Sequence, residues 1–175
     1  MKIRRGIRIE RTPAQVFALI SAPSRYPEFF VGMTRWEPRT RRQKGLGAQF
    51  RVLMRVGSID AGGTLRITEW KRNERIAWDC VAGLEQRGAW EVRPSDGGSE
   101  LALEIEFSLA RPLGWLAERI AGRVVERHMT ATLLAARRLL EFEEQPNRAA
   151  KSSGNKALGR SRERERKRRV PSDRQ

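Results

Sequence analysis

The chain has 175 residues, a usual length for one domain, and it contains a single Cys and a single His. One Cys excludes an internal disulfide, and one Cys with one His excludes the usual zinc sites, which need about four such ligands. Its 36 Lys and Arg residues outnumber its 21 Asp and Glu residues, which gives a formal net charge of +15.

The sequence shows no sign of membrane insertion or export. Its longest stretch without a charged residue runs from Thr12 to Ser24, which is shorter than the ~18 apolar residues that cross a bilayer. The basic N-terminus, Met1 to Glu10, is not followed by the apolar segment of a secretory signal. We therefore expect a cytoplasmic protein.

The charge is concentrated at the C-terminal end. Residues 146–175 carry eleven Lys and Arg against three Asp and Glu, with Leu158 and Val170 as their only large apolar side chains. This segment can bury too little apolar surface to fold, so we predict a folded domain at 1–145 and a disordered tail at 146–175. Within the tail, residues 160–169 could be a solubilising segment, or could make weak, non-specific contacts with nucleic acid or anionic membranes.

The N-terminal part predicts one strand and two short helices. Ile3, Ile7 and Ile9 follow the period-2 spacing of a half-buried strand over Ile3–Glu10. Thr12, Pro13 and Gln15 then form a typical helix N-terminus. A second short helical turn is expected within 24–30.

Alternating apolar residues predict six further strands, separated by Gly, Asn and Pro turn signals. These strands cover Thr34–Thr40, Ala48–Val56, Ile59–Trp70, Arg75–Val81, Gln86–Arg93 and Glu100–Leu109. From Pro112 to about Glu144 the apolar spacing changes to three and four, which indicates one long amphipathic helix. The predicted fold is α+β, with a curved antiparallel sheet of about seven strands wrapped around the C-terminal helix.

Alternation along each strand also predicts which side chains face the helix. The inward set is apolar: Phe50, Val52, Met54, Val56, Leu65, Ile67, Ile76, Trp78, Cys80, Gly88, Trp90, Val92, Leu101, Leu103, Ile105, Phe107 and Leu109. The outward set is charged: Arg51, Arg55, Arg66, Asp79, Glu91, Arg93, Glu104 and Glu106. No inward carboxylate or cation is available to move protons.

His128 is the one inward residue suited to acid-base chemistry, and we place it near the middle of the helix's apolar arc. It could instead be a core histidine bound to a backbone carbonyl, and Cys80 is expected to be a small buried apolar residue. Trp78, Trp90 and Trp36 could form aromatic walls for an apolar ligand or simply fill a core. Gly45-Leu46-Gly47 lacks the third glycine and the following helix of a dinucleotide-binding loop.

The chain resembles the SRPBCC superfamily, the START-like or helix-grip group that contains polyketide cyclase/dehydrase and lipid-transport proteins. The resembling segments are Ile7–Phe17, Ala22–Phe30, Gly45–Gly47 with Phe50, Ile67–Trp70, Arg75–Trp78, Gly88–Val92, Gly97–Leu101 and Pro112–Trp115. The resemblance implies a helix-grip fold with an apolar cavity between sheet and helix. It implies no particular activity, because members of the group use this cavity to carry, sense or cyclise ligands.

Two functions remain open. The first is binding or transport of a hydrophobic small molecule, such as a lipid, polyketide-like or isoprenoid compound, with no cofactor and no metal. The second is an aromatase/cyclase-like enzyme in which His128 handles a proton. The expected ligand-binding residues are Trp36, Phe50, Met54, Leu65, Ile67, Trp78, Cys80, Trp90, Leu103, Ile105, Phe107, Ile120, Val124 and His128.

Overall fold

The computed structural model describes residues 1–108 and 114–142, and for 114–118 it describes the backbone alone. The tail predicted at 146–175, Leu109 and the helix entry at Pro112 lie outside the described residues. The compact folded unit spans Met1–Glu141. No helix in the described ranges has the length and apolar character needed to cross a membrane.

The elements follow the order expected from the sequence. The strands are β1 (Lys2–Ile9), β2 (Met33–Pro38), β3 (Gln49–Val56), β4 (Ile59–Lys71), β5 (Arg75–Gly83), β6 (Gln86–Ser95) and β7 (Gly98–Phe107). The helices are α1 (Pro13–Ile20), a 3-10 turn (Pro23–Arg25), α2 (Tyr26–Phe29) and α3 (Gly114–Phe142).

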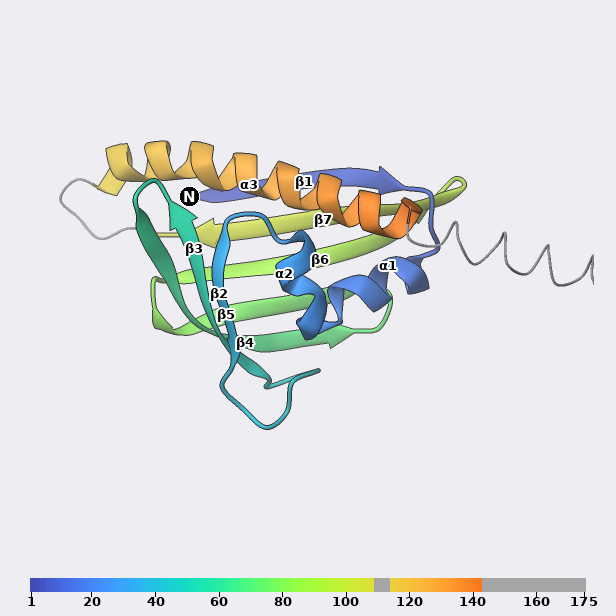
Figure 1. The fold of residues 1–175 in the computed structure, drawn as a ribbon, viewed down its shortest axis with the longest axis horizontal. Coiled ribbons are helices and arrows are strands. Elements are labelled where there is room, and N and C mark those ends of the chain that lie inside the picture. Colours follow the sequence, from blue (N-terminus) through green and yellow to red (C-terminus); the bar gives the residue numbers. More distant parts are fainter. Residues whose placement is uncertain (109–113, 143–175) are drawn as a thin grey trace, which may run out of the picture. The chain divides into compact units, whose positions relative to one another are not determined.

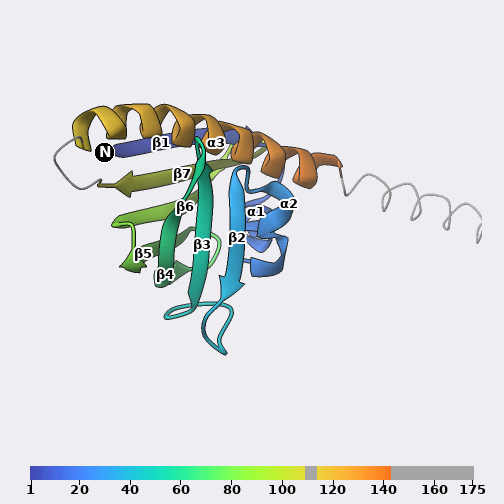
Figure 2. The same cartoon turned by 60° about the vertical axis from the view of Figure 1, so that its left-hand side comes forward.

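The seven strands form one antiparallel sheet in the order β1-β7-β6-β5-β4-β3-β2. The sheet is strongly curved, and β2 and β3 run steeply across the direction of β6 and β7 (Figures 1 and 2). Register shifts in β4, between Thr64 and Leu65 and between Ile67 and Glu69, fall within this bend. Gly62 also favours the bend, because a Cβ atom there would lie 2.2 Å from the carbonyl oxygen of Val52.

Helix α1 begins at the predicted cap. The Thr12 side chain accepts a hydrogen bond from the backbone N–H of Gln15, and the Gln15 side chain accepts one from the backbone N–H of Thr12. The helix buries Val16, Phe17 and Leu19 and packs on β6 and β7. Helix α1 therefore covers the part of the concave face that β6 and β7 form.

Helix α3 lies along the concave side of the sheet. It is rotated about its own axis relative to the orientation expected from the sequence. Its most deeply buried residues are Met129, Thr132, Leu133 and Ala136. His128 is only half-buried, so it lies at the edge of the buried arc and not at its middle. Because one helical step turns a side chain by about 100°, the polar Thr132 takes the central place that apolar spacing alone did not suggest.

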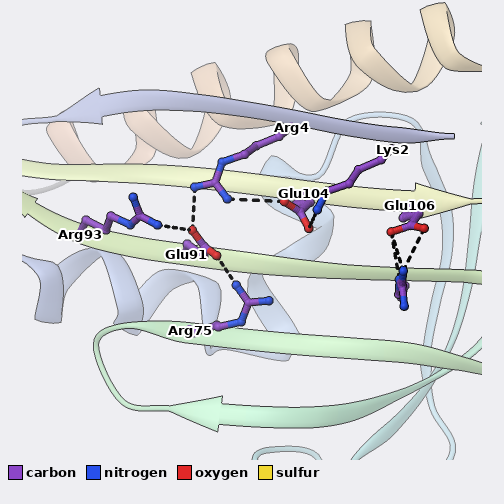
Figure 3. Close-up of polar contacts among 8 residues, drawn as sticks. Lys2, Arg4, Arg75, Glu91, Arg93, Glu104 and Glu106 are labelled. Carbon is purple, nitrogen blue, oxygen red and sulfur yellow. Dashed lines mark hydrogen bonds and ion pairs between the residues drawn. The ribbon is translucent and has the colours of Figure 1, made fainter.

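The convex face of the sheet carries ion pairs over β1, β7, β6 and β5 (Figure 3). Glu91 accepts charged contacts from Arg4 at 2.6 Å, from Arg93 at 3.2 Å and from Arg75. The hydrogen bond from Arg4 is the main reason that the pKa of Glu91 is below its usual value. The predicted division between an apolar concave face and a charged convex face is confirmed.

Candidate ligand-binding cavity

A cavity of about 390 Å³ lies between the concave face of the sheet, α2 and α3. Its volume falls within the usual range for small-molecule sites, roughly 300–1,000 Å³. Nearly all of the lining is apolar or aromatic, and no described lining residue is charged. The lining residues are Tyr26, Phe30, Met33, Trp36, Phe50, Val52, Met54, Val56, Ile59, Ala61, Gly62, Leu65, Ile67, Trp78, Leu84, Gln86, Ile105, Phe107, Ile120, Ala121, Val125, His128 and Met129.

Four aromatic rings in near-parallel contact form one wall. The ring centroids of Tyr26 and Trp36 are 4.3 Å apart, and those of Trp36 and Phe50 are 4.5 Å apart. Phe30 extends the stack on the other side of Tyr26, with centroids 5.9 Å apart. A stack of this kind presents a rigid apolar surface, because each ring is held by its neighbours.

The Tyr26 hydroxyl is not available for ligand chemistry. It donates a 2.8 Å hydrogen bond to the backbone carbonyl of Ile20. Burial raises the pKa of Tyr26 above its ordinary value, so this phenol stays protonated at neutral pH. We therefore assign Tyr26 a structural role in the wall.

Among the described lining residues, His128 is the one titratable group left for ligand chemistry, and its ring lies against the backbone of Gly32. Gly32 has φ +82°, and a Cβ atom at this position would lie 2.3 Å from His128 Nδ1. One helical turn further along α3, Thr132 Oγ1 accepts a 2.9 Å hydrogen bond from the backbone N–H of Val31. These two contacts hold the 31–32 segment against α3 and fix the orientation of the imidazole.

The surroundings of the imidazole favour its neutral form. Burial lowers the pKa of His128 below 6.5, and the neighbouring Arg127 lowers it further. Its Nδ1 atom is buried and has no hydrogen-bond partner among the described residues, and the same holds for Trp78 Nε1. Unpartnered polar atoms of this kind are costly unless a ligand or a water molecule satisfies them.

The lining reaches the surface where two isoleucines are exposed. Ile59, at the start of β4, is 63% exposed, and Ile120, near the start of α3, is 61% exposed. Both residues also line the cavity. This places the contact between the cavity and solvent near the β3–β4 turn and the first turns of α3.

The structure brings most of the expected ligand-binding residues to this cavity. Those in the lining are Trp36, Phe50, Met54, Leu65, Ile67, Trp78, Ile105, Phe107, Ile120 and His128.

Four of the expected residues lie elsewhere. Trp90 is 0% exposed and packs against Phe29 and Phe30, and Leu103 is also fully buried, so both belong to the solid core. Cys80 donates a weak 3.3 Å hydrogen bond to the carbonyl of Ala82. Val124 is turned about 100° away from Val125, which takes its place in the lining.

Other lining residues were absent from the expected set. Tyr26 and Phe30 come from a segment whose aromatic content was visible but whose position over the sheet was not. Gln86 lies at the first position of β6, where alternation alone does not separate a lining residue from a turn residue. Met129 could have been found only from the true rotation of α3.

A family model for polyketide cyclase/dehydrase and lipid-transport proteins matches residues 1–141. The chain belongs to this family. Within the described residues no cluster of His, Cys, Asp and Glu is suited to hold a metal ion. None of the curated proteins matches the chain significantly.

Solved structures share the fold at low sequence identity. A protein from Thermus thermophilus has a TM-score of 0.71 at 16% identity, over 80% of this chain and 97% of its own. The Zhui aromatase/cyclase from a Streptomyces species has a TM-score of 0.67 at 18% identity, over 82% and 97%. A START superfamily protein from Mycobacterium smegmatis has a TM-score of 0.62 at 14% identity, over 79% and 98%. At these identities the similarity establishes the helix-grip fold alone.

Proposed function

We propose that this protein binds a neutral hydrophobic small molecule, such as a lipid, polyketide-like or isoprenoid compound, in the cavity between the sheet and α3. The observation that carries the proposal is a cavity of about 390 Å³ whose described lining contains no charged residue. An apolar ligand that buries a few hundred Å² there gains several kcal/mol at ~25 cal/mol per Å². This gain is enough for useful affinity after the cost of association.

The polar atoms of the lining support a ligand with one or two hydrogen-bonding groups. The neutral imidazole of His128 can donate or accept a hydrogen bond, the Trp78 indole N–H can donate one, and the Gln86 amide can do both. A carboxylate or an amine would lose its hydration without meeting an opposite charge. A hydroxyl or carbonyl group would not carry this penalty.

The test uses the purified full chain. Native mass spectrometry followed by solvent extraction identifies any ligand that co-purifies, and tryptophan fluorescence is then titrated with neutral apolar compounds and with their carboxylate analogues. We expect a saturable change with the neutral compounds that is lost in Trp36→Phe/Trp78→Phe. A chain that carries nothing extractable and shows no fluorescence change with any compound would refute the proposal.

His128 favours a second candidate function, an aromatase/cyclase-like enzyme. The cavity would hold a reactive chain in a folded shape while the imidazole moves a proton. His128→Ala would then abolish turnover of a polyketide-like substrate while the variant still folds, as circular dichroism shows, and still binds the substrate measurably. Unchanged turnover in this variant would remove His128 from the mechanism.

A further inference from the structure

The convex face of the sheet has two unlike halves. Over β1, β7, β6 and β5 most of its cations are neutralised, as by Lys2 with Glu104 at 2.8 Å and Arg87 with Glu106 at 2.9 Å (Figure 3). Over β3, β4 and the loop that joins β2 to β3 the cations outnumber the carboxylates. Between Glu37 and Asp60 the sequence contains no acidic residue.

Five cations of β3, β4 and the β2–β3 loop form what we call the basic surface: Arg39, Arg41, Arg42, Arg51 and Arg66. None of the five makes an ion pair with any residue in the described ranges. Four of them are exposed, and Arg51 is half-buried. The two neighbouring arginines that do find carboxylates, Arg35 with Glu37 and Arg55 with Asp60, lie at its margins.

Backbone pairing brings these cations together. The backbone N–H of Arg39 donates to the carbonyl of Gln49, and Gln49 is the register partner of Arg66 on β4. The end of the loop is also tied to β4, because Ile67 N–H donates to the carbonyl of Ala48. Arg51 lies two residues after Gln49 and therefore on the same, outward side of β3.

Two carboxylates lie close to the basic surface without neutralising it. Glu37 is the register partner of Arg51 but pairs with Arg35. Asp79 is the register partner of Arg66, yet the two side chains form no ion pair. The surface thus keeps an excess of positive charge whose self-repulsion an anionic partner would relieve.

We infer that the basic surface binds the sugar-phosphate backbone of a nucleic acid without reading its sequence. All five cations are arginines, whose planar guanidinium groups match phosphate oxygens in bidentate geometry. The cations extend along a loop and two strands and do not converge on one point, as a single small phosphate would require. Leu46 is the one strongly exposed apolar side chain of the loop, which offers little area for insertion into a bilayer.

The basic surface does not overlap the opening of the cavity. The β2–β3 loop lies at the opposite end of β3 from the β3–β4 turn (Figures 1 and 2). Ile59, where the cavity lining meets solvent, follows that turn. Nucleic acid and a cavity ligand could therefore bind at the same time, and the inference is independent of the proposed function.

The test compares two full-length triple variants that lose the same charge. Arg41→Gln/Arg51→Gln/Arg66→Gln removes three cations of the basic surface, and Lys2→Gln/Arg87→Gln/Arg93→Gln removes three paired cations from the other half. Residues 160–169 are present in both variants, so any contribution from them cancels. The readout is fluorescence anisotropy of a labelled random-sequence duplex and single strand across a salt series.

We expect the first variant to bind at least about tenfold more weakly, with a salt slope reduced by about two to three, and the second to change binding by less than about twofold. Arg41→Lys/Arg51→Lys/Arg66→Lys, which keeps the charge, should retain most of the affinity and verifies that the site is intact. Equal losses in both glutamine variants, no binding by wild type, or a selective loss of binding to phosphatidylglycerol vesicles with nucleic-acid binding unchanged would each overturn the inference.

Discussion

The two ends of the apolar interior are built from the same sheet and the same kinds of residue, yet one is solid and the other is hollow. In the solid part, Trp90, Phe29 and Leu103 are almost completely excluded from solvent. In the hollow part, Ile67 and Ile105 are only half-buried and face the cavity. Helix α1 and Phe29 of α2 fill the first space, whereas the second, bounded by Tyr26 of α2 and by α3, is left unfilled.

The difference shows where stability and binding reside. Closely packed side chains stabilise the fold through burial and dispersion contacts, and a void forfeits those contacts. The hollow part therefore contributes less to folding than its apolar composition suggests. A ligand that enters the cavity would restore the missing contacts and raise the stability of the folded state.

Replacing a ring in the solid part should have the largest effect. Trp90→Ala removes a fully buried ring that packs against Phe29 and Phe30, and we expect it to destabilise the fold by about 3 to 5 kcal/mol. Trp36→Ala, at the half-buried cavity wall, should cost less than half as much. Urea denaturation followed by circular dichroism measures both, and equal losses would show that the interior is packed alike at both ends.

Gly32 tests the contact that orients His128. Gly32→Ala should cost about 2 to 4 kcal/mol, because it combines a left-handed backbone conformation with a methyl group placed against the imidazole. Gly47→Ala is a matched control, since Gly47 also has φ +82° but has open space around its Cβ position, and it should cost only about 1 kcal/mol. When His128→Ala is combined with Gly32→Ala, the denaturation midpoint should recover most of the stability that Gly32→Ala loses beyond Gly47→Ala. A Gly47→Ala loss as large as that of Gly32→Ala would argue against a close contact.

A bulky residue distinguishes the hollow from the core at neighbouring positions of one strand. Ile105→Trp should occupy the cavity, change the unfolding free energy by about 1 kcal/mol or less, and abolish ligand-induced fluorescence changes. Leu103→Trp, two residues earlier on the same face of β7, should instead overpack the core and lower stability by about 1 to 3 kcal/mol or more. Full ligand binding by Ile105→Trp would mean that the ligand lies elsewhere.

The smallest effect concerns pH. Because the pKa of His128 in the folded state is lowered below 6.5 by burial, the unfolded chain binds its proton first as the pH falls. The contribution of His128 to the free energy of unfolding should therefore be fully present above pH 6.5 and should decline as the pH falls from 6.5 toward the folded-state pKa. The decline should be missing from His128→Gln in melting temperatures measured between pH 7.5 and 5.5, and an identical pH profile in both proteins would contradict the burial of the imidazole.

Local chemistry was sufficient to predict the elements. The alternation of apolar residues located seven strands to within a few residues, and the cap formed by Thr12 and Gln15 located the start of α1. These features depend on neighbours in the chain, so their periodicity is visible in the sequence. The convex ion pairs follow from the same alternation, because it sets which residues face solvent.

The tertiary structure decided which inward side chains surround empty space. Trp78 and Trp90 have the same inward direction on adjacent strands, yet only Trp78 lines the cavity. The rotation of α3, which selects Val125 over Val124 and presses His128 onto Gly32, was likewise not readable from apolar spacing. Periodicity specifies the direction of a side chain, but what fills the space in front of it depends on segments distant in the chain, here α1 and Phe29 at one end and Tyr26 with α3 at the other.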